Sequence, residues 1–250
     1  MQSLTLIVIT KNEAGQIARC LHSVPFASQV VVVDSGSSDG TVEIAKSLGA
    51  QVVQTPDWPG FGPQKNRALD LARCDWVLSL DADEYLSLPL QEQVRQALQS
   101  SDVSAFRFPR RSSYCGQFMH HSGWYPDYVT RLFRRGSARF SGDIVHEQLM
   151  VQGPLGTLKA DLMHESFKTL DDVLAKLNAY STAGAEKMHR SGRRGSLTQA
   201  VARGLWAFFR TYVLRLGFLD GRRGFLLAVS NAEGTYYRYV KLWLMDQGPH

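Results

Sequence analysis

The chain has 250 residues, 44% of them hydrophobic and 20% charged, a balance that indicates an ordinary globular protein and excludes a disordered one. This length suits one large domain, or one domain with an appendage, around an ample apolar core. The 28 basic and 23 acidic residues give a net charge of +5, and eight arginines lie between Arg190 and Arg223 with Asp220 as the only acid among them. An anionic partner, either phosphate groups or an acidic membrane surface, explains such a segment, and a solvated basic face is the alternative.

Three cysteines, Cys20, Cys74 and Cys115, are scattered without C-x-x-C spacing. A sparse, odd set indicates a reducing compartment, and core filling is the expected role of the first two. The first residues lack the basic segment of a signal peptide, and no run of 18 apolar residues occurs. We therefore expect a cytoplasmic protein.

The first hundred residues alternate apolar runs with helical patterns. The runs predict buried strands at residues 4–10, 30–34, 51–54 and 76–80. Apolar residues at helical spacing predict helices at residues 17–24, 39–49, 68–72 and 90–98, with Asp39 as an N-cap and Gly49 as a stop. Such alternation predicts an α/β fold, in which helices cover both faces of a mostly parallel sheet.

Ligands of such sheets bind outside the carboxyl ends of the strands. Three polar clusters occupy these ends: Thr10–Glu13, Asp34–Gly36 and Asp81–Asp83. The sequence therefore predicts that they converge on one edge of the sheet.

The chain changes character after about residue 107, where short strands carry aromatic residues, arginines and glycine turns up to His164. Three helical segments follow at residues 170–189, 197–216 and 225–245, with one clear linker at residues 191–196. We expect a first domain of residues 1–168 and a helical C-terminal region of residues 169–250.

The acidic run Asp81–Glu84 directly follows the apolar strand at 76–80. On an extended chain Asp81 and Asp83 point to the same side. Carboxylates held together need a cation, and hard oxygen ligands suit Mg²⁺ or Mn²⁺, which would also hold a diphosphate. The alternative is a helix cap or a solvated turn.

Other residues at this edge have a functional and a structural interpretation. Asp34 is placed to accept a hydrogen bond from a nucleotide base, or to cap its own turn, and Gly36 allows the backbone to approach a ligand closely. Neither a G-x-G-x-x-G nor a G-x-x-x-x-G-K-[ST] motif occurs, which disfavours a nicotinamide cofactor and excludes P-loop enzymes.

Together, Thr10–Glu13, Val32–Thr41 and Asp81–Asp83 resemble the three opening signatures of family 2 glycosyltransferases, and Lys65–Arg67 matches the family's third helix. The tail around Gly217–Gly221 resembles the branch that contains lipopolysaccharide inner-core β-glucosyltransferases. The resemblance implies a GT-A fold in residues 1–168 and an inverting enzyme that uses nucleotide-diphosphate sugars.

The same resemblance implies roles for individual residues. Those expected to bind the nucleotide sugar are Thr10, Asn12, Glu13, Asp34, Gly36, Lys65, Arg67, Asp81 and Ala82. A divalent cation, Mg²⁺ or Mn²⁺, is expected on Asp83 and Asp81, with His146 completing its shell and His164 as the alternative. The expected catalytic base is Asp127, which follows Pro126 where the family has a glutamate, and its competitor is Glu147.

Aromatic residues and arginines between Arg107 and Arg131 suit an acceptor that is both a sugar and an anion, or are strand surface and core. The apolar segment at residues 205–216 is too short and too charged to span a bilayer. It suits a helix in the interface of an anionic inner membrane, or packing against the catalytic domain or a second subunit, and a homo-oligomer stays open. We therefore expect a peripheral protein on the inner face of the cytoplasmic membrane, with no nucleic acid partner.

The expected reaction is metal-dependent transfer of glucose from UDP-glucose to a lipopolysaccharide core heptose, with inversion. One alternative is transfer to another cell-envelope glycan or to a lipid phosphate. A sugar nucleotidyltransferase is the other alternative, but it requires a glycine-rich, arginine-containing loop after the first strand, where Lys11–Glu13 stands.

Overall fold

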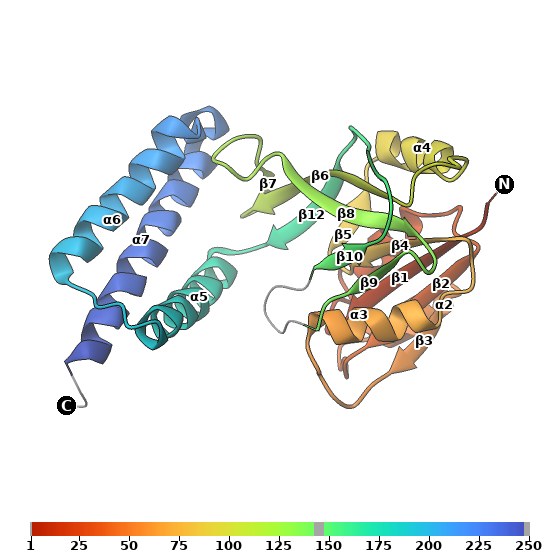
Figure 1. Ribbon diagram of the computed structural model, residues 1–250, viewed down its shortest axis with the longest axis horizontal. Coiled ribbons are helices and arrows are strands. Elements are labelled where there is room, and N and C mark those ends of the chain that lie inside the picture. Colours follow the sequence, from red (N-terminus) through yellow and green to blue (C-terminus); the bar gives the residue numbers. More distant parts are fainter. Residues whose placement is uncertain (1, 143–147, 248–250) are drawn as a thin grey trace. The chain divides into compact units, whose positions relative to one another are not determined.

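Figure 1 shows the computed structural model of the chain, which describes residues 2–142 and 148–247. The chain forms two compact units. The first comprises Met1–Arg110 and Asp127–His164, and the second comprises Arg111–Pro126 and Glu165–His250. The predicted donor signatures thus lie in the first unit, whereas the second joins a segment from the middle of the chain to the C-terminal helices. The division into domains at residues 168 and 169 stays a prediction.

The main sheet has the strand order β3-β2-β1-β4-β8-β6-β12-β5. Its parallel part consists of β3 (Gln51–Gln54), β2 (Gln29–Asp34), β1 (Leu4–Thr10) and β4 (Trp76–Asp81). The strands beyond it are β8 (Asp127–Arg134), β6 (Ala105–Tyr114), β12 (Leu162–Phe167) and β5 (Glu84–Leu86). The short strands are β7 (Gln117–Phe118) and β11 (Leu155–Thr157), which pair with β6, and β9 (Ala138–Phe140) and β10 (Leu149–Val151), which pair with each other.

Helices cover both faces of the parallel strands (Figure 1). They are α1 (Ile17–His22), α2 (Thr41–Ser47), α3 (Phe61–Asp70) and α4 (Leu88–Ala97). Every residue of β1 is buried, because alternate side chains enter two different apolar cores. Leu6 and Val8 pack in the core that contains buried residues of α1, α2 and α4, whereas Ile7 packs in the core that contains those of α3.

The predicted α/β class, a mostly parallel sheet covered by helices and followed by a helical C-terminal part, is confirmed. The expected strands and helices of the first hundred residues are all present. One local prediction is wrong, because the chain does not continue as an extended strand through Asp83. β4 ends at Asp81, a turn at residues 82–83 follows, and β5 begins at Glu84.

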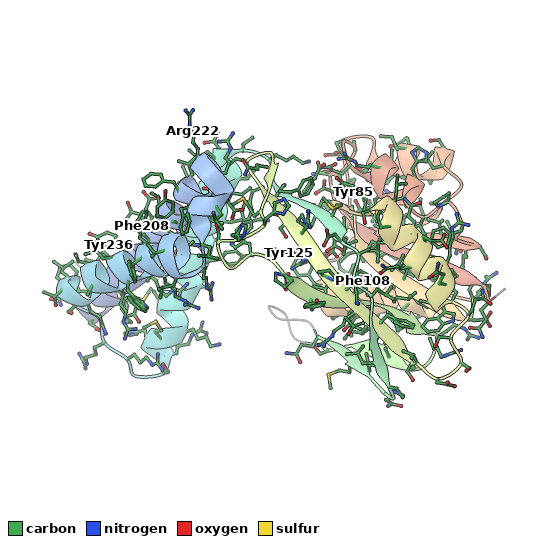
Figure 2. The ribbon with its side chains drawn as sticks, turned by 90° about the horizontal axis from the view of Figure 1, so that it is seen from above. Tyr85, Phe108, Tyr125, Phe208, Arg222 and Tyr236 are labelled. Carbon is green, nitrogen blue, oxygen red and sulfur yellow. The ribbon has the colours of Figure 1, made fainter. Side chains whose placement is uncertain are left out.

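In the second unit, three long helices follow β12: α5 (Leu170–Arg190), α6 (Leu197–Phe209) and α7 (Gly221–Asp246). α5 begins with a capping box, in which the Thr169 side chain accepts a hydrogen bond from Asp172 N–H and the Asp172 carboxylate accepts one from Thr169 N–H. α6 and α7 approach closely at Gly204, where an added Cβ would lie 3.3 Å from the Tyr236 Cβ. Figure 2 shows Phe208 and Tyr236 on these two helices and Arg222 projecting away from them.

The helix expected at residues 197–216 is shorter than predicted. α6 ends at Phe209, a π-helical turn spans Arg210–Leu214, and a 3₁₀ turn spans Gly217–Asp220. Within the part of the chain that the structure describes, no helix combines the length and the apolar character needed to cross a bilayer.

Candidate functional site

The register of the parallel strands aligns the predicted polar ends. Thr10 pairs with Asp34 across β1 and β2, and Ile9 pairs with Asp81 across β1 and β4. The three strands therefore end at the same edge of the sheet, as the sequence predicts. This edge carries the candidate site.

Two loops at this edge are bound to each other. Asn12 has a positive φ of 56°, its N–H donates to Ser37 Oγ at 2.8 Å, and its side-chain oxygen accepts from Ser38 N–H at 2.9 Å. The N–H of Glu13 donates to Thr41 Oγ1 at 2.9 Å. The loop after β1 and the loop after β2 thus form one rigid wall, with Gly36 at a positive φ of 83° in its turn.

Asp34 is fully buried within this wall. Its Oδ1 accepts from Gly36 N–H at 3.1 Å and Ser37 N–H at 2.9 Å, and its Oδ2 accepts from the Ser37 hydroxyl. The carboxylate therefore stabilises its own turn, which is the structural interpretation of this residue.

Asp81 is held between two basic side chains. Its Oδ1 lies 2.9 Å from Lys65 Nζ, and its Oδ2 lies 2.6 Å from Arg131 Nη2. Lys65 and Arg131 are almost completely buried, with exposed fractions of 1% and 7%. Burial by itself raises the pKa of the Asp81 carboxyl, but the charges and hydrogen bonds of Arg131 and Lys65 outweigh it, so that this pKa lies well below its usual range.

A second ion-pair chain continues from Arg131. Its Nη2 also lies 2.9 Å from Oε1 of Glu84, a fully buried carboxylate whose Oε2 accepts from Asp81 N–H at 3.0 Å. Arg110 reaches the same Oε1 at 3.3 Å and donates to Asp127 Oδ2 through Nη2 at 2.7 Å and Nε at 3.0 Å. Asp127, 46% exposed at its side chain, is thus fixed in orientation but accessible.

Asp83 faces a histidine rather than a basic side chain. Its Oδ2 lies 3.3 Å from His164 Nε2, and the two side chains are 25% and 17% exposed. β12 and β5 create this contact, because His164 pairs in register with Glu84, the residue after Asp83.

The pair of Asp83 and His164 fits a divalent cation. Two ligands at right angles, each about 2.1 Å from one ion, lie about 3 Å apart, close to the observed separation. In the described residues no group of three or more His, Cys, Asp or Glu side chains is arranged for a metal ion. Mg²⁺ is commonly bound by one or two protein carboxylates together with substrate phosphates, so two protein ligands are enough.

Cys20 is buried close to these acidic side chains. Its buried thiol lies 3.6 Å from the carbonyl oxygen of Asp81. Burial raises its pKa well above the usual value, and the negative charges of Glu84, Asp81 and Asp83 raise it further. The core-filling role predicted for this cysteine agrees with its burial.

Two polar side chains complete the edge. Thr10 is 5% exposed, and its Oγ1 has no hydrogen-bond partner among the described residues. A buried hydroxyl without a partner is costly, so this atom is suited to meet a ligand. Gln64, which belongs to no motif of the sequence, is fully buried and donates to Ser35 Oγ at 3.0 Å and Thr55 Oγ1 at 2.7 Å.

The predicted site residues differ in where they lie. The structure brings Lys65, Asp81 and Asp127 into one ion-pair network with Glu84, through Arg131 and Arg110, whereas Asp83 pairs with His164. The only sequence signal for a role of Glu84 was its place in the acidic run Asp81–Glu84. Arg67 instead forms a bidentate pair with Asp57, at 2.9 and 2.7 Å, while Ala82 is buried in the turn.

The remaining predictions concern metal ligands and the acceptor cluster. Asp81 was expected as a metal ligand, but each of its carboxylate oxygens is paired with a basic side chain. His146 and Glu147 lie outside the described residues, and His164, the alternative ligand, is the histidine found at Asp83. The arginines and aromatic residues expected to bind the acceptor are divided between the two units. Arg110 and Arg131 belong to the first unit, where they pair with Glu84 and Asp81, whereas Tyr114 and Trp124 belong to the second.

Comparison with known proteins gives the family. The family model described as glycosyl transferase family 2 matches residues 5–155. An uncharacterized glycosyltransferase of Rickettsia bellii is 31% identical over 257 residues, covering 96% of this chain and 86% of that protein. The lipopolysaccharide core biosynthesis glycosyltransferase LpsC of Rhizobium meliloti is 29% identical over 253 residues, covering 96% of this chain and 92% of that protein.

Among solved structures, that of S. aureus TarS residues 1–349 is similar to this chain with a TM-score of 0.49 and 16% identity, covering 99% of this chain and 93% of that chain.

The family match spans more than half of the chain and includes all three signatures at the sheet edge. The alternative of a sugar nucleotidyltransferase is thereby left without support. This chain belongs to glycosyl transferase family 2, and it is a glycosyltransferase.

Proposed function

We propose that this glycosyltransferase is inverting and metal-dependent, and that it transfers glucose from UDP-glucose to a heptose of the lipopolysaccharide core. The observation that carries the proposal is the meeting of Asp83 and His164 beside the Lys65–Asp81–Arg131 network. The likeness to a relative named as a lipopolysaccharide core biosynthesis glycosyltransferase supports the acceptor class. Another cell-envelope glycan or a lipid phosphate is the alternative acceptor.

The nucleotide sugar would bind along the edge formed by the loops after β1 and β2. Thr10 Oγ1 would donate to or accept from the nucleoside, which would remove the cost of leaving this buried hydroxyl unpaired. The joined loops with Asn12, Glu13 and Gly36 would form the wall of the nucleoside site. Lys65, which Asp81 already holds in place, would direct its positive charge toward the diphosphate.

Asp83 and His164 would hold the divalent cation, and their separation of 3.3 Å supports this assignment. When bound, the ion would supply Lewis-acid stabilisation of the departing diphosphate. Asp81 would not bind the ion, because its two oxygens are paired with Lys65 and Arg131. It would instead hold these two basic side chains in place next to the ion.

Asp127 would remove the proton from the attacking acceptor hydroxyl. Arg110 holds one of its oxygens through two N–H groups and so fixes the direction of the carboxylate, while its exposure leaves room for an acceptor. Attack from the side opposite to the diphosphate gives inversion at the anomeric carbon in a single displacement.

The test is incubation of the protein with Mn²⁺ and a panel of nucleotide sugars, followed by chromatography of the released nucleoside diphosphate. We expect slow hydrolysis of UDP-glucose that stops with EDTA and in Asp83→Asn. If no nucleotide sugar is cleaved above the rate of a protein-free sample, or if EDTA has no effect, the proposal is wrong.

We also propose that the second unit binds an anionic membrane surface and that the protein is therefore peripheral on the cytoplasmic membrane. Twelve exposed large apolar side chains lie between residues 197 and 226, including Leu205 at 68% and Leu219 at 56% exposure. Exposed Arg203 and Arg222 accompany them. Apolar side chains with arginines nearby suit the boundary between anionic headgroups and acyl chains.

Flotation with phosphatidylglycerol vesicles, compared with phosphatidylcholine vesicles, tests this surface. We expect binding that requires the anionic lipid and that Leu205→Glu abolishes. Leu155→Glu, at a leucine of the first unit with 47% exposure, is the matched control and keeps binding. Equal binding to both vesicle types, or an equal loss in both variants, contradicts the assignment.

A further inference from the structure

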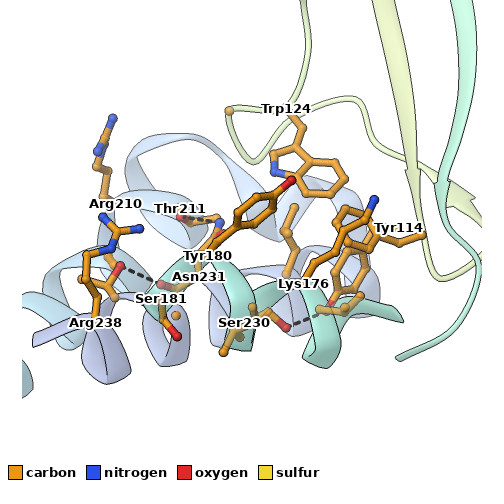
Figure 3. A pocket seen from close by; sticks show the side chains of 18 of the residues that line it. Tyr114, Trp124, Lys176, Tyr180, Ser181, Arg210, Thr211, Ser230, Asn231 and Arg238 are labelled. Atoms are coloured by element: carbon orange, nitrogen blue, oxygen red, sulfur yellow. Dashed lines mark hydrogen bonds between the residues drawn. The ribbon is translucent and has the colours of Figure 1, made fainter. Parts of the chain in front are cut away.

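The second unit contains a pocket of about 480 Å³ that takes no part in the proposed reaction (Figure 3). Side chains of α5, α6, the following π-helical turn and α7 line it, together with Tyr114 of β6 and Trp124. Small-molecule sites have volumes of about 300–1,000 Å³, so this pocket has the size of a ligand site.

The charge of the pocket is entirely positive. Lys176, Arg210, Arg215 and Arg238 line it, and no acidic residue does. Among the described residues, none of these four forms an ion pair with an acid. Lys176, Arg210 and Arg215 are exposed to solvent and Arg238 is partly buried, so the pocket presents a positive potential that attracts anions.

Arg238 is positioned by a close approach between helices. A Cβ added at Gly184 of α5 would lie 2.7 Å from Arg238 Nε, so the Arg238 side chain passes close over a residue that has no side chain to obstruct it. Its Nε is buried and has no hydrogen-bond partner within the described part of the chain. A buried donor without a partner is rare and indicates a missing acceptor.

Aromatic and neutral polar groups form the rest of the lining. Trp124 is partly buried, and Tyr180 is 63% exposed and can adapt to a bound ring. Tyr114 OH and Ser230 Oγ lie 2.8 Å apart, and Asn231 donates to Thr211 Oγ1 at 3.3 Å, as Figure 3 shows. Hydroxyls and amides that both donate and accept, next to aromatic faces, suit a sugar, whereas the guanidinium groups suit a phosphate.

We infer that this pocket binds a sugar that carries a phosphate, and that it holds the phosphorylated saccharide of the acceptor. Arg238 and Arg210 bind the phosphate, and the polar and aromatic lining binds the ring. This assignment rests on the proposed function for its biological role, although binding can be measured without any transfer. The ligand is either a free sugar phosphate or one linked to a lipid.

Isothermal titration with glucose 6-phosphate tests the shared chemistry. We expect saturable binding that is tighter than binding of glucose or of inorganic phosphate. Arg238→Gln and Arg210→Gln each weaken it about ten- to hundredfold, as expected when one charged hydrogen-bond partner is lost. Arg193→Gln, at an exposed linker arginine outside the pocket, removes the same charge and leaves the affinity unchanged.

Cosedimentation with phosphatidylcholine vesicles that contain lipid A, a phosphorylated disaccharide on acyl chains, distinguishes the source. Vesicle binding that Arg210→Gln weakens and Arg193→Gln does not, without binding of glucose 6-phosphate, assigns the lipid-linked form. If Arg238→Gln lowers the melting temperature, its loss of binding is not counted. The affinity of Arg210→Gln, which changes an exposed side chain, then decides whether the pocket binds the probe.

The inference is overturned if the unmodified protein binds neither probe, or if Arg193→Gln weakens binding as much as Arg210→Gln does. Hydrolysis of UDP-glucose by the unmodified protein is measured in parallel. Hydrolysis without binding of either probe contradicts only the pocket, whereas pocket-dependent binding without hydrolysis of any nucleotide sugar contradicts the proposed function.

Discussion

Replacement of Arg131 by methionine removes the cation shared by Asp81 and Glu84, at 2.6 and 2.9 Å. Breaking a buried ion pair by removing one partner costs about 3–5 kcal/mol, because the remaining charge loses its compensation. Here Asp81 keeps Lys65 and Glu84 keeps Arg110, so we expect the lower end, about 3 kcal/mol. For a protein of this size that loss lowers the melting temperature by roughly 6–12 °C.

Thermal unfolding of the wild type and Arg131→Met at pH 7 and at about pH 3 measures this effect. The pKa of Asp81 is depressed in the folded protein, so its stabilisation is complete above the unfolded value of about 3.9 and is lost as the pH falls toward the folded pKa. The difference between the two proteins should therefore shrink in acid. Arg139→Met removes an arginine paired with Asp70 at the surface, where both side chains are more than half exposed, and should change little. A loss of stability at pH 7 no larger than that of Arg139→Met would show that Arg131 does not stabilise the buried carboxylates.

Three further predictions concern the site. Asp83→Asn and His164→Gln should each weaken Mn²⁺-dependent UDP-glucose binding at least about tenfold in titrations. The control His22→Gln, at an exposed histidine, should not weaken it. Equal affinity with and without Mn²⁺ in the wild type would exclude the metal assignment. Asp127→Asn should lower the transfer rate by about 10²–10⁴-fold and leave the donor affinity unchanged. The control Asp102→Asn, at an exposed aspartate, should keep the wild-type rate. Full activity of Asp127→Asn would favour Glu147 as the base. The thiolate is the reactive form of cysteine, and the pKa of Cys20 is raised. Alkylation of Cys20 by iodoacetamide at about pH 8, followed by peptide mass spectrometry, should therefore be slow in the folded protein and fast in urea. Rapid labelling of Cys20 in the folded protein would contradict its burial.

The sequence predicted the sheet and its polar edge because each depends on local patterns. The apolar runs that became β1, β2 and β4 are short and continuous, and parallel pairing then brings Thr10, Asp34 and Asp81 to one edge. The prediction failed at Asp83, because a turn of two residues separates β4 from β5 and sends the second carboxylate to His164.

Long-range partners could not be read from the sequence. Arg131 meets Asp81 across 50 positions of the chain, and only the antiparallel addition of β8 beside β4 explains why. Asp34 fits both a nucleoside contact and a turn, and the choice depends on whether Ser37 folds back onto it, which spacing does not reveal. The positive pocket of the second unit likewise combines residues from three helices that no motif links.

We propose that Asp83 and His164 hold a cation that binds the diphosphate of a nucleotide sugar beside Lys65. A crystal structure with Mn²⁺ and UDP, with anomalous scattering measured near the manganese edge, tests it most directly. We expect one strong peak within bonding distance of Asp83 Oδ and His164 Nε2, with the UDP phosphates bound next to it. A manganese peak bound elsewhere on the protein, or UDP bound away from the edge formed by β1, β2 and β4, would contradict it.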